Sequence, residues 1–158
     1  MGQVDAIRER LFSIFPGLKN DADFKLTSPA TPDYNCISWA YSYSDRWMWP
    51  RSGETNCLDG VLYWPDGIID SEDVTAFVEA FKLKGYNLCD SWEHEEGYRR
   101  IALYVEKGTS CTHASRELST GKWTSKLGQL PDIQHGNPFS IEGIAYGRVY
   151  CIMKREHI

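Results

Sequence analysis

The order of the periodic segments constrains this chain most, because helical patterns occupy its first half and strand patterns its second. Residues 3–15 carry apolar side chains at helical spacing, and Pro16-Gly17 ends that segment. A second helical stripe runs from Val74 to Phe81 and stops at Gly85. Helices followed by a run of antiparallel strands are typical of an α+β fold.

Alternating side chains predict the strands of the second half. Ile101, Leu103 and Val105 alternate with smaller or polar-tipped residues, as in a half-buried strand. Further strands are expected at about 111–118, 123–126 and 146–154, with a loop over 128–137. No repeat or linker divides the chain, so the 158 residues predict a single domain. Residues 1–30 would form a helix and lead-in, and residues 31–154 the core.

Composition excludes several classes of function. The net charge of -5 and the lack of a basic cluster argue against a nucleic-acid partner. No apolar run is long enough to cross a bilayer, and the N-terminus mixes charges as a signal peptide does not. The five cysteines include no CxxC pair, which favours free thiols in a reducing compartment. We therefore expect a cytoplasmic protein, or one exported without a cleaved signal peptide, that binds no membrane.

Cys36 is the strongest candidate nucleophile. Asn35 is a good N-cap residue, and the apolar face that follows predicts a short buried helix starting at Cys36. A helix N-terminus beside an imidazole favours the reactive thiolate, and its free N–H groups would stabilise an oxyanion. A single cysteine is more often an inert core residue, so the setting of Cys36 carries this prediction.

Two of the four histidines are candidates for the base. His113 lies near the start of a predicted strand, and His135 lies in the predicted loop. His94 stands among glutamates and His157 at the tail, so we expect both to be solvated and silent in catalysis. Ser125 and Asp132 are further candidates to orient an imidazole by hydrogen bonding.

Short motifs in this chain resemble those of known hydrolases. Tyr34–Ala40 (Tyr-Asn-Cys-Ile-Ser-Trp-Ala) resembles the nucleophile helix of NlpC-type and CHAP-type cell-wall hydrolases, which an Asn-Cys or Asp-Cys step opens. Thr112–Ser115, Gly121–Gly128 and Asp132–His135 are similar to bacterial NlpC-like domains, many of which occur in polymorphic toxins or in proteins of unknown function. The whole chain also resembles an uncharacterised bacterial domain family with this set of motifs. The likeness covers roughly residues 31–150.

The resemblance implies a papain-like cysteine hydrolase or amidase with Cys36 as nucleophile and His113 as general base. The orienting role stays open among Ser125, Asp132 and His135, and His135 is favoured because the related pattern carries a histidine there. The implied substrate is a peptide or peptidoglycan amide, and the implied setting is a toxin-associated or effector domain. The chemistry needs no cofactor and no metal.

A second alignment leads to a different function. It places Arg100 before the Ile101 strand, where related enzymes carry the base, and makes His113 only the third member of the site. The chain would then be a catalytically inactive interaction or immunity module that binds a protein partner. Contact between Cys36 and His113, together with a depressed thiol pKa, would favour the enzyme.

Aromatic residues surround the predicted nucleophile. The segments 46–50 and 63–65 would either line a substrate groove or, for most of their rings, form a tryptophan-rich flap over a small core. A zinc set built on Cys111 and His113, completed by Asp132 or His135, is a weaker alternative because no paired zinc spacing occurs. The candidate substrate contacts are Tyr34, Asn35, Trp39, Trp47, Trp49 and Trp123.

Overall fold

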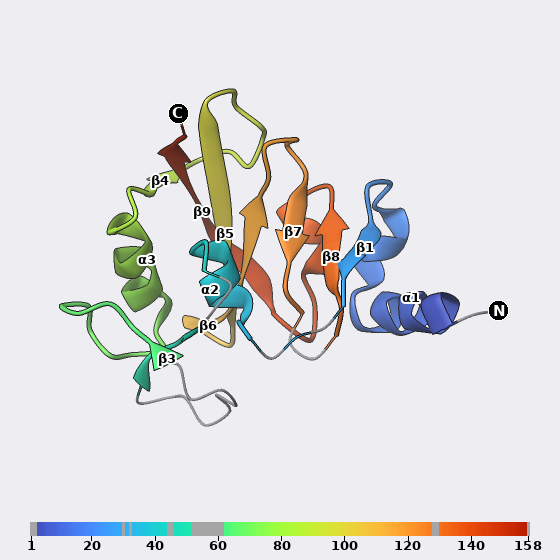
Figure 1. Cartoon of the computed structure of the whole chain (residues 1–158), viewed down its shortest axis with the longest axis horizontal. Coiled ribbons are helices and arrows are strands. Elements are labelled where there is room, and N and C mark those ends of the chain that lie inside the picture. Colours follow the sequence, from blue (N-terminus) through green and yellow to red (C-terminus); the bar gives the residue numbers. More distant parts are fainter. Residues whose placement is uncertain are drawn as a thin grey trace.

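The computed structural model describes residues 3–29, 31, 33–43, 46–51, 62–127 and 130–157. It is a mixed α and β fold built around one large antiparallel sheet (Figure 1). The described helices are α1 (Gln3–Ile14), η1 (Pro16–Asn20), α2 (Cys36–Ala40), α3 (Val74–Lys82) and η3 (Pro138–Ile141). The described strands are β1 (Lys25–Ser28), β2 (Trp47–Met48), β3 (Leu62–Tyr63), β4 (Asn87–Cys89), β5 (Tyr98–Glu106), β6 (Ser110–Glu117), β7 (Trp123–Ser125), β8 (Asp132–His135) and β9 (Arg148–Glu156).

The main sheet orders its strands β1-β8-β7-β6-β5-β9-β4, and each described pairing in it is antiparallel. Three of these strands, β1, β4 and β8, were not predicted. β8 occupies the expected loop at 128–137, and β1 occupies the expected lead-in. Each has only four residues, too few for a clear alternating pattern, and their mutual pairing stabilises them. Because β1 belongs to the sheet, the predicted boundary at residue 30 does not separate two parts of the fold.

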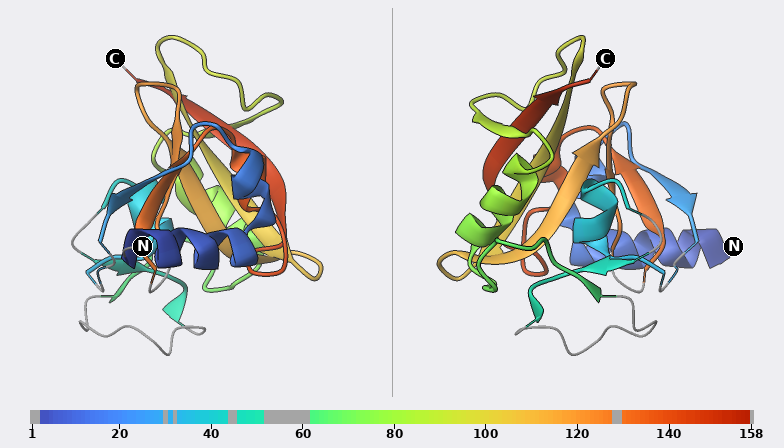
Figure 2. Two further views of the ribbon diagram at one scale, coloured as in Figure 1. Left: turned by 90° about the vertical axis from the view of Figure 1, so that its right-hand side faces the viewer. Right: turned by 60° about the vertical axis from the view of Figure 1, so that its left-hand side comes forward.

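Helices cover both faces of the sheet. In the right-hand view of Figure 2, α2 and α3 lie on the near side and α1 lies behind. The first core cluster fills the α2 and α3 side, and the second fills the side of α1, η1 and η3. Sheet residues of the first cluster include Ile101, Leu103, Val105, Cys111, Ala114 and Met153. Sheet residues of the second cluster include Ala102, Tyr104, Trp123, Ile133 and Ile152.

A bulge in β6 decides which way its first side chains point. Tyr104 pairs with His113, whereas the next residue, Val105, pairs with Cys111, so Thr112 is the extra residue. Cys111 therefore packs in the first core cluster, while His113 packs against Tyr104 on the other face. The zinc set built on Cys111 and His113 needs both side chains on one face of the strand, and the bulge places them on opposite faces. Within the described residues, no three His, Cys, Asp or Glu side chains come together to hold a metal ion.

None of the helices in the described ranges combines the length and the apolar character that a membrane span requires.

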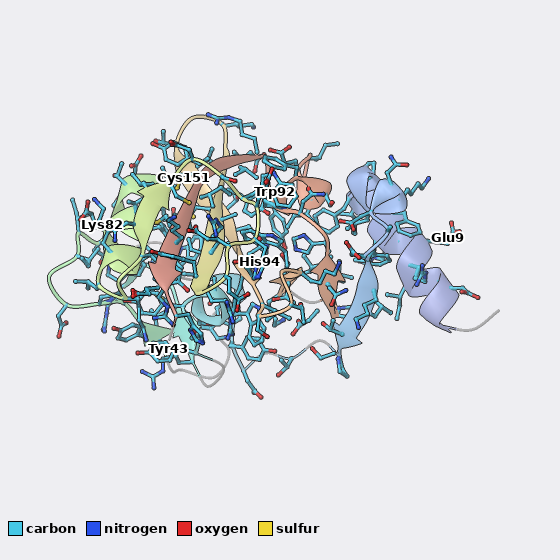
Figure 3. The ribbon with its side chains drawn as sticks, turned by 90° about the horizontal axis from the view of Figure 1, so that it is seen from above. Glu9, Tyr43, Lys82, Trp92, His94 and Cys151 are labelled. Atoms are coloured by element: carbon cyan, nitrogen blue, oxygen red, sulfur yellow. The ribbon has the colours of Figure 1, made fainter. Side chains whose placement is uncertain are left out.

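His94 is exposed, as predicted, but it also contacts a buried carboxylate (Figure 3 labels His94). Its Nδ1 lies 3.0 Å from Oε2 of Glu117, a carboxylate whose side chain is fully buried. The other oxygen of Glu117 accepts a hydrogen bond from the backbone N–H of Arg100 at 3.1 Å. The imidazole therefore satisfies a buried acceptor at one end of β6.

The change His94→Ala is expected to lower the free energy of unfolding by about 1–3 kcal/mol, because it leaves a buried carboxylate oxygen without its partner. Urea denaturation followed by tryptophan fluorescence measures the loss. His157→Ala is the matched control, since His157 is exposed, and it should leave the unfolding midpoint unchanged. Equal midpoints for both variants would show that the Glu117 contact does not stabilise the fold.

Candidate active site

Asn35 caps the helix that begins at Cys36, as predicted. Its Oδ1 accepts a hydrogen bond from Ser38 N at 3.0 Å, and Ser38 Oγ accepts one from Asn35 N at 2.9 Å. The Asn35 amide also exchanges hydrogen bonds with the backbone of Met48. These bonds hold Cys36 at the first helical position and tie α2 to β2. The Asn35 side chain therefore serves as a cap, and not as a free substrate contact.

Cys36 is half-buried against the first core cluster (Figure 1 shows α2 in front of the sheet). Burial raises the pKa of the Cys36 thiol to about 11. The backbone N–H groups of Ala114, Ile37 and Cys36 itself oppose that rise, as does the positive charge of Lys126. The thiol is therefore protonated at neutral pH in the resting structure.

His113, Ser125 and His135 form a buried hydrogen-bonded chain across β6, β7 and β8. His113 Nε2 lies 3.1 Å from Ser125 Oγ, and Ser125 Oγ lies 2.8 Å from His135 Nε2. His135 Nδ1 lies 2.8 Å from the carbonyl oxygen of Asn137. All three side chains are fully buried. Ser125 thus bridges the two predicted histidines, a role for which it was one of three candidates.

The carbonyl oxygen of Asn137 sets the proton positions along this chain, because it can only accept. His135 must carry its proton on Nδ1, so its Nε2 accepts the hydroxyl proton of Ser125. Ser125 Oγ then accepts from His113 Nε2–H, which leaves His113 Nδ1 as a bare lone pair. That nitrogen is buried and has no hydrogen-bond partner in the described part of the chain.

Burial keeps both imidazoles neutral. It lowers the pKa of His113 well below its ordinary value, and the neighbouring His135 lowers it further. Burial also lowers the pKa of His135 to about 4. Aromatic rings enclose His113: Tyr146 stacks on it with centroids 4.0 Å apart, and Tyr104 meets it edge-on at 5.2 Å. His113 is therefore held in one orientation as a neutral base.

No hydrogen bond joins Cys36 and His113 in this structure, since His113 Nδ1 has no partner among the described residues. Tyr146 lies near both, because it stacks on His113 and is affected electrostatically by Cys36. Arg100, the base position of the second alignment, donates to Ser91 and Glu95 instead of lying at the site. The resting structure contains a neutral thiol and a neutral imidazole, and not the ion pair that the sequence led us to expect.

Asp132 lies on the α2 side of the sheet, away from the histidine chain. Its Oδ2 accepts hydrogen bonds from Tyr34 Oη at 2.8 Å and from Ser28 Oγ at 2.9 Å. Its Oδ1 is buried without a partner among the described residues. Tyr34 stacks on Trp39, with ring centroids 5.7 Å apart. Asp132 therefore does not orient His113, and instead anchors the segment that leads into Cys36.

The remaining candidate contacts divide by burial. Trp123 is fully buried in the second core cluster, so it lines no substrate surface. Trp39 is half-buried on α2 and donates from Nε1 to Thr124 Oγ1 at 3.0 Å. Trp47 and Trp49 are half-buried as well, and Trp49 donates to Glu72. Trp39 lies in the same helix as Cys36, and its indole is partly exposed to solvent.

The sequence interpretation missed Lys126, Tyr146 and the Asn137 carbonyl. Lys126 follows Ser125 directly, and its 1% exposure is unusual for a lysine, but no sequence pattern announces a buried cation. Tyr146 reaches His113 from 33 residues away through the turn that Gly143 and Gly147 close, with mutual backbone hydrogen bonds of 2.9 and 2.8 Å. Only the folded chain brings these groups to the site.

Comparison with known proteins identifies a family but no activity. No curated protein and no solved structure is significantly similar to the chain. None of the comparisons links it to papain-like enzymes, so that likeness stays a prediction. The model of one family, described as a domain of unknown function (DUF7689), matches residues 25–154, which include every candidate site residue. The chain therefore belongs to the DUF7689 family.

Proposed function

We propose that this domain is a thiol-dependent amide hydrolase of papain-like type, with Cys36 as nucleophile and His113 Nδ1 as general base. The single observation that carries the proposal is the lone pair on His113 Nδ1. A buried polar atom without a partner costs stability, and a structural histidine would have no reason to keep one. The chain through Ser125, His135 and the Asn137 carbonyl holds that lone pair available.

The proposed reaction starts from the neutral pair. Cys36 Sγ forms a bond to the amide carbon, the carbonyl electrons move to oxygen, and the thiol proton passes to His113 Nδ1. A water molecule carries that proton, because no hydrogen bond joins the two side chains among the described residues. His113 then gives the proton to the amide nitrogen, and the C–N bond breaks to release the amine. Water hydrolyses the thioester by the reverse proton route and restores the thiol.

Backbone groups near Cys36 suit the developing oxyanion. The N–H groups of Cys36, Ile37 and Ala114 all stabilise negative charge at the sulfur position. Donors that stabilise charge at this point would also stabilise the oxygen of a tetrahedral intermediate. We propose a peptide or a peptidoglycan cross-link as the substrate, with Trp39 and Tyr34 beside the reacting carbon. This substrate class rests on the likeness of Tyr34–Ala40 to cell-wall hydrolases.

The pH dependence of Cys36 modification tests the proposal. With a peptide chloromethyl ketone, we expect the rate at pH 5.5 to stay close to the rate at pH 7.5, because the lowered pKa of His113 keeps it a free base there. In His113→Asn the reaction needs the free thiolate of a group with a pKa of about 11. The rate should therefore fall about tenfold for each unit by which the pH is lowered. Mass spectrometry of the peptide containing Cys36 measures both rates. Identical profiles for the two proteins would exclude His113 as the base.

A second candidate function is a non-catalytic module that binds a protein partner. The observations that favour it are the raised pKa of the Cys36 thiol and the lack of a Cys36–His113 hydrogen bond among the described contacts. The same experiment separates the two functions. A binding module predicts that Cys36 reacts no faster with the peptide reagent than its pKa allows, in the wild type as in His113→Asn.

A further inference from the structure

Lys126 is a buried cation that the proposed reaction does not yet use. Its exposed fraction is 1%, in a chain whose other lysines reach the solvent over much of their length, such as Lys122 and Lys82 at 40% and 43% of the side chain. Burying an ammonium costs several kcal/mol unless other groups stabilise it. Neighbouring groups therefore offset that cost, and Tyr34 and Asp132 are two of them.

Strand alternation directs Lys126 toward α2. Ser125 points to His113 and His135 on the face of the second core cluster, so the next residue along the chain points to the opposite face. There the Lys126 ammonium lies 5.7 Å from the ring centroid of Tyr34. Tyr34 stands two residues before Cys36, stacks on Trp39, and donates to Asp132. Lys126 thus lies against the segment that delivers Cys36.

The charges around Cys36 come from several elements. Lys126 follows β7, Asp132 begins β8, and both act on each other electrostatically. Lys126 also acts directly on Cys36, and it is the cation whose charge favours the thiolate there. Cys111 of β6 and Tyr146 of the 143–147 turn are neutral at neutral pH because burial raises the pKa of each. Lys126 is therefore the charged group that acts on the Cys36 sulfur, and Asp132 acts on Lys126.

We propose that Lys126 is the charge partner of Cys36: its ammonium stabilises negative charge on the sulfur while His113 carries the proton. Asp132, held by Tyr34 and Ser28, offsets part of the ammonium charge and so tempers its effect on the sulfur. This inference rests on the proposed function of Cys36 as a nucleophile. It assigns Lys126 and Asp132 opposite effects on the reactivity of the same atom.

The test is the rate of alkylation of Cys36 by iodoacetamide at pH 8.5, measured peptide by peptide on the native protein. Lys126→Met is expected to slow alkylation of Cys36 by about fivefold or more, because it removes the cation and keeps the length of the side chain. Asp132→Asn is expected to accelerate it, since the ammonium is then opposed by no carboxylate. Lys82→Met is the matched control: it removes an equal charge from the surface of α3, and the rate should not change (Figure 3).

Opposite shifts in the two variants support the assignment, because loss of packing around Cys36 would change both rates in the same direction. Two equal rates, or two shifts of the same sign, would overturn it. Lys126→Arg distinguishes a folding defect, since it keeps the charge and should keep the wild-type rate if charge is what acts. Iodoacetamide alkylation reports the sulfur and not proton transfer. If the Lys126 and Asp132 variants do not behave as expected, the role of His113 is still tested separately by the peptide chloromethyl ketone. If His113→Asn does not behave as expected, the iodoacetamide rates still test Lys126.

Discussion

Cys36→Ala should abolish amide hydrolysis, by about 10³-fold or more, while leaving the fold intact. The loss is large because the sulfur forms the covalent bond of the proposed reaction, and no other group in the described site can replace it. The fold should persist because alanine fills most of the half-buried position and the Asn35 cap depends on backbone and Ser38 atoms. Release of amine from a panel of peptide and peptidoglycan amides measures the activity.

Cys151→Ala is the matched control for that experiment. Cys151 is also half-buried and packs against the first core cluster, but it lies on β9, away from α2 (Figure 3). We expect this variant to keep full activity. Hydrolysis retained in Cys36→Ala would end the nucleophile assignment and, with it, the catalytic role of His113.

Gly147→Ala should destabilise the protein by about 3 kcal/mol or more, the largest expected effect of a single methyl group in this chain. Gly147 has φ +78, and a Cβ there would lie 2.0 Å from the carbonyl oxygen of Val105. The backbone of β5 or of the turn must move to relieve that overlap, and the positive φ adds its own cost. Because the neighbouring Tyr146 stacks on His113, the displacement would also disturb the candidate base.

Gly67→Ala separates the two contributions. Gly67 has a similar φ of +84, but nothing lies within 4 Å of the position its Cβ would occupy. This variant should therefore lose only about 1 kcal/mol from the backbone conformation. Urea denaturation of both proteins measures the difference. Similar losses in both variants would mean that the contact between Gly147 and Val105 relaxes at little cost.

The sequence predicted the elements whose stability comes from local pattern. The helical stripe over 3–15 corresponds to α1, and the polar cap at Asn35 corresponds to the start of α2. The alternation at 101–105 corresponds to β5 in the centre of the sheet. Apolar periodicity and capping act within a few residues, so a single chain segment contains the information that they need. The antiparallel order of the later strands followed from the same patterns.

The sequence did not predict the short strands β1 and β8, because four residues contain too little pattern to distinguish a strand from a loop. It also did not predict the direction of the His113 side chain. One bulged residue, Thr112, reverses the face to which His113 points, and no composition or spacing rule indicated it. The contact between His94 and Glu117 was missed for a similar reason, since the two residues lie 23 positions apart.

The sequence by itself determined the longer elements, the cap before Cys36 and the residue types available for chemistry. The tertiary structure alone decided which of those residues meet: His113 with Ser125, His135 and Tyr146, and Tyr34 with Lys126 and Asp132. The physical reason is that side-chain direction changes with each residue of a strand, and with each bulge. Residue types are local properties of a sequence, whereas the neighbours of a buried side chain depend on the register of the whole sheet.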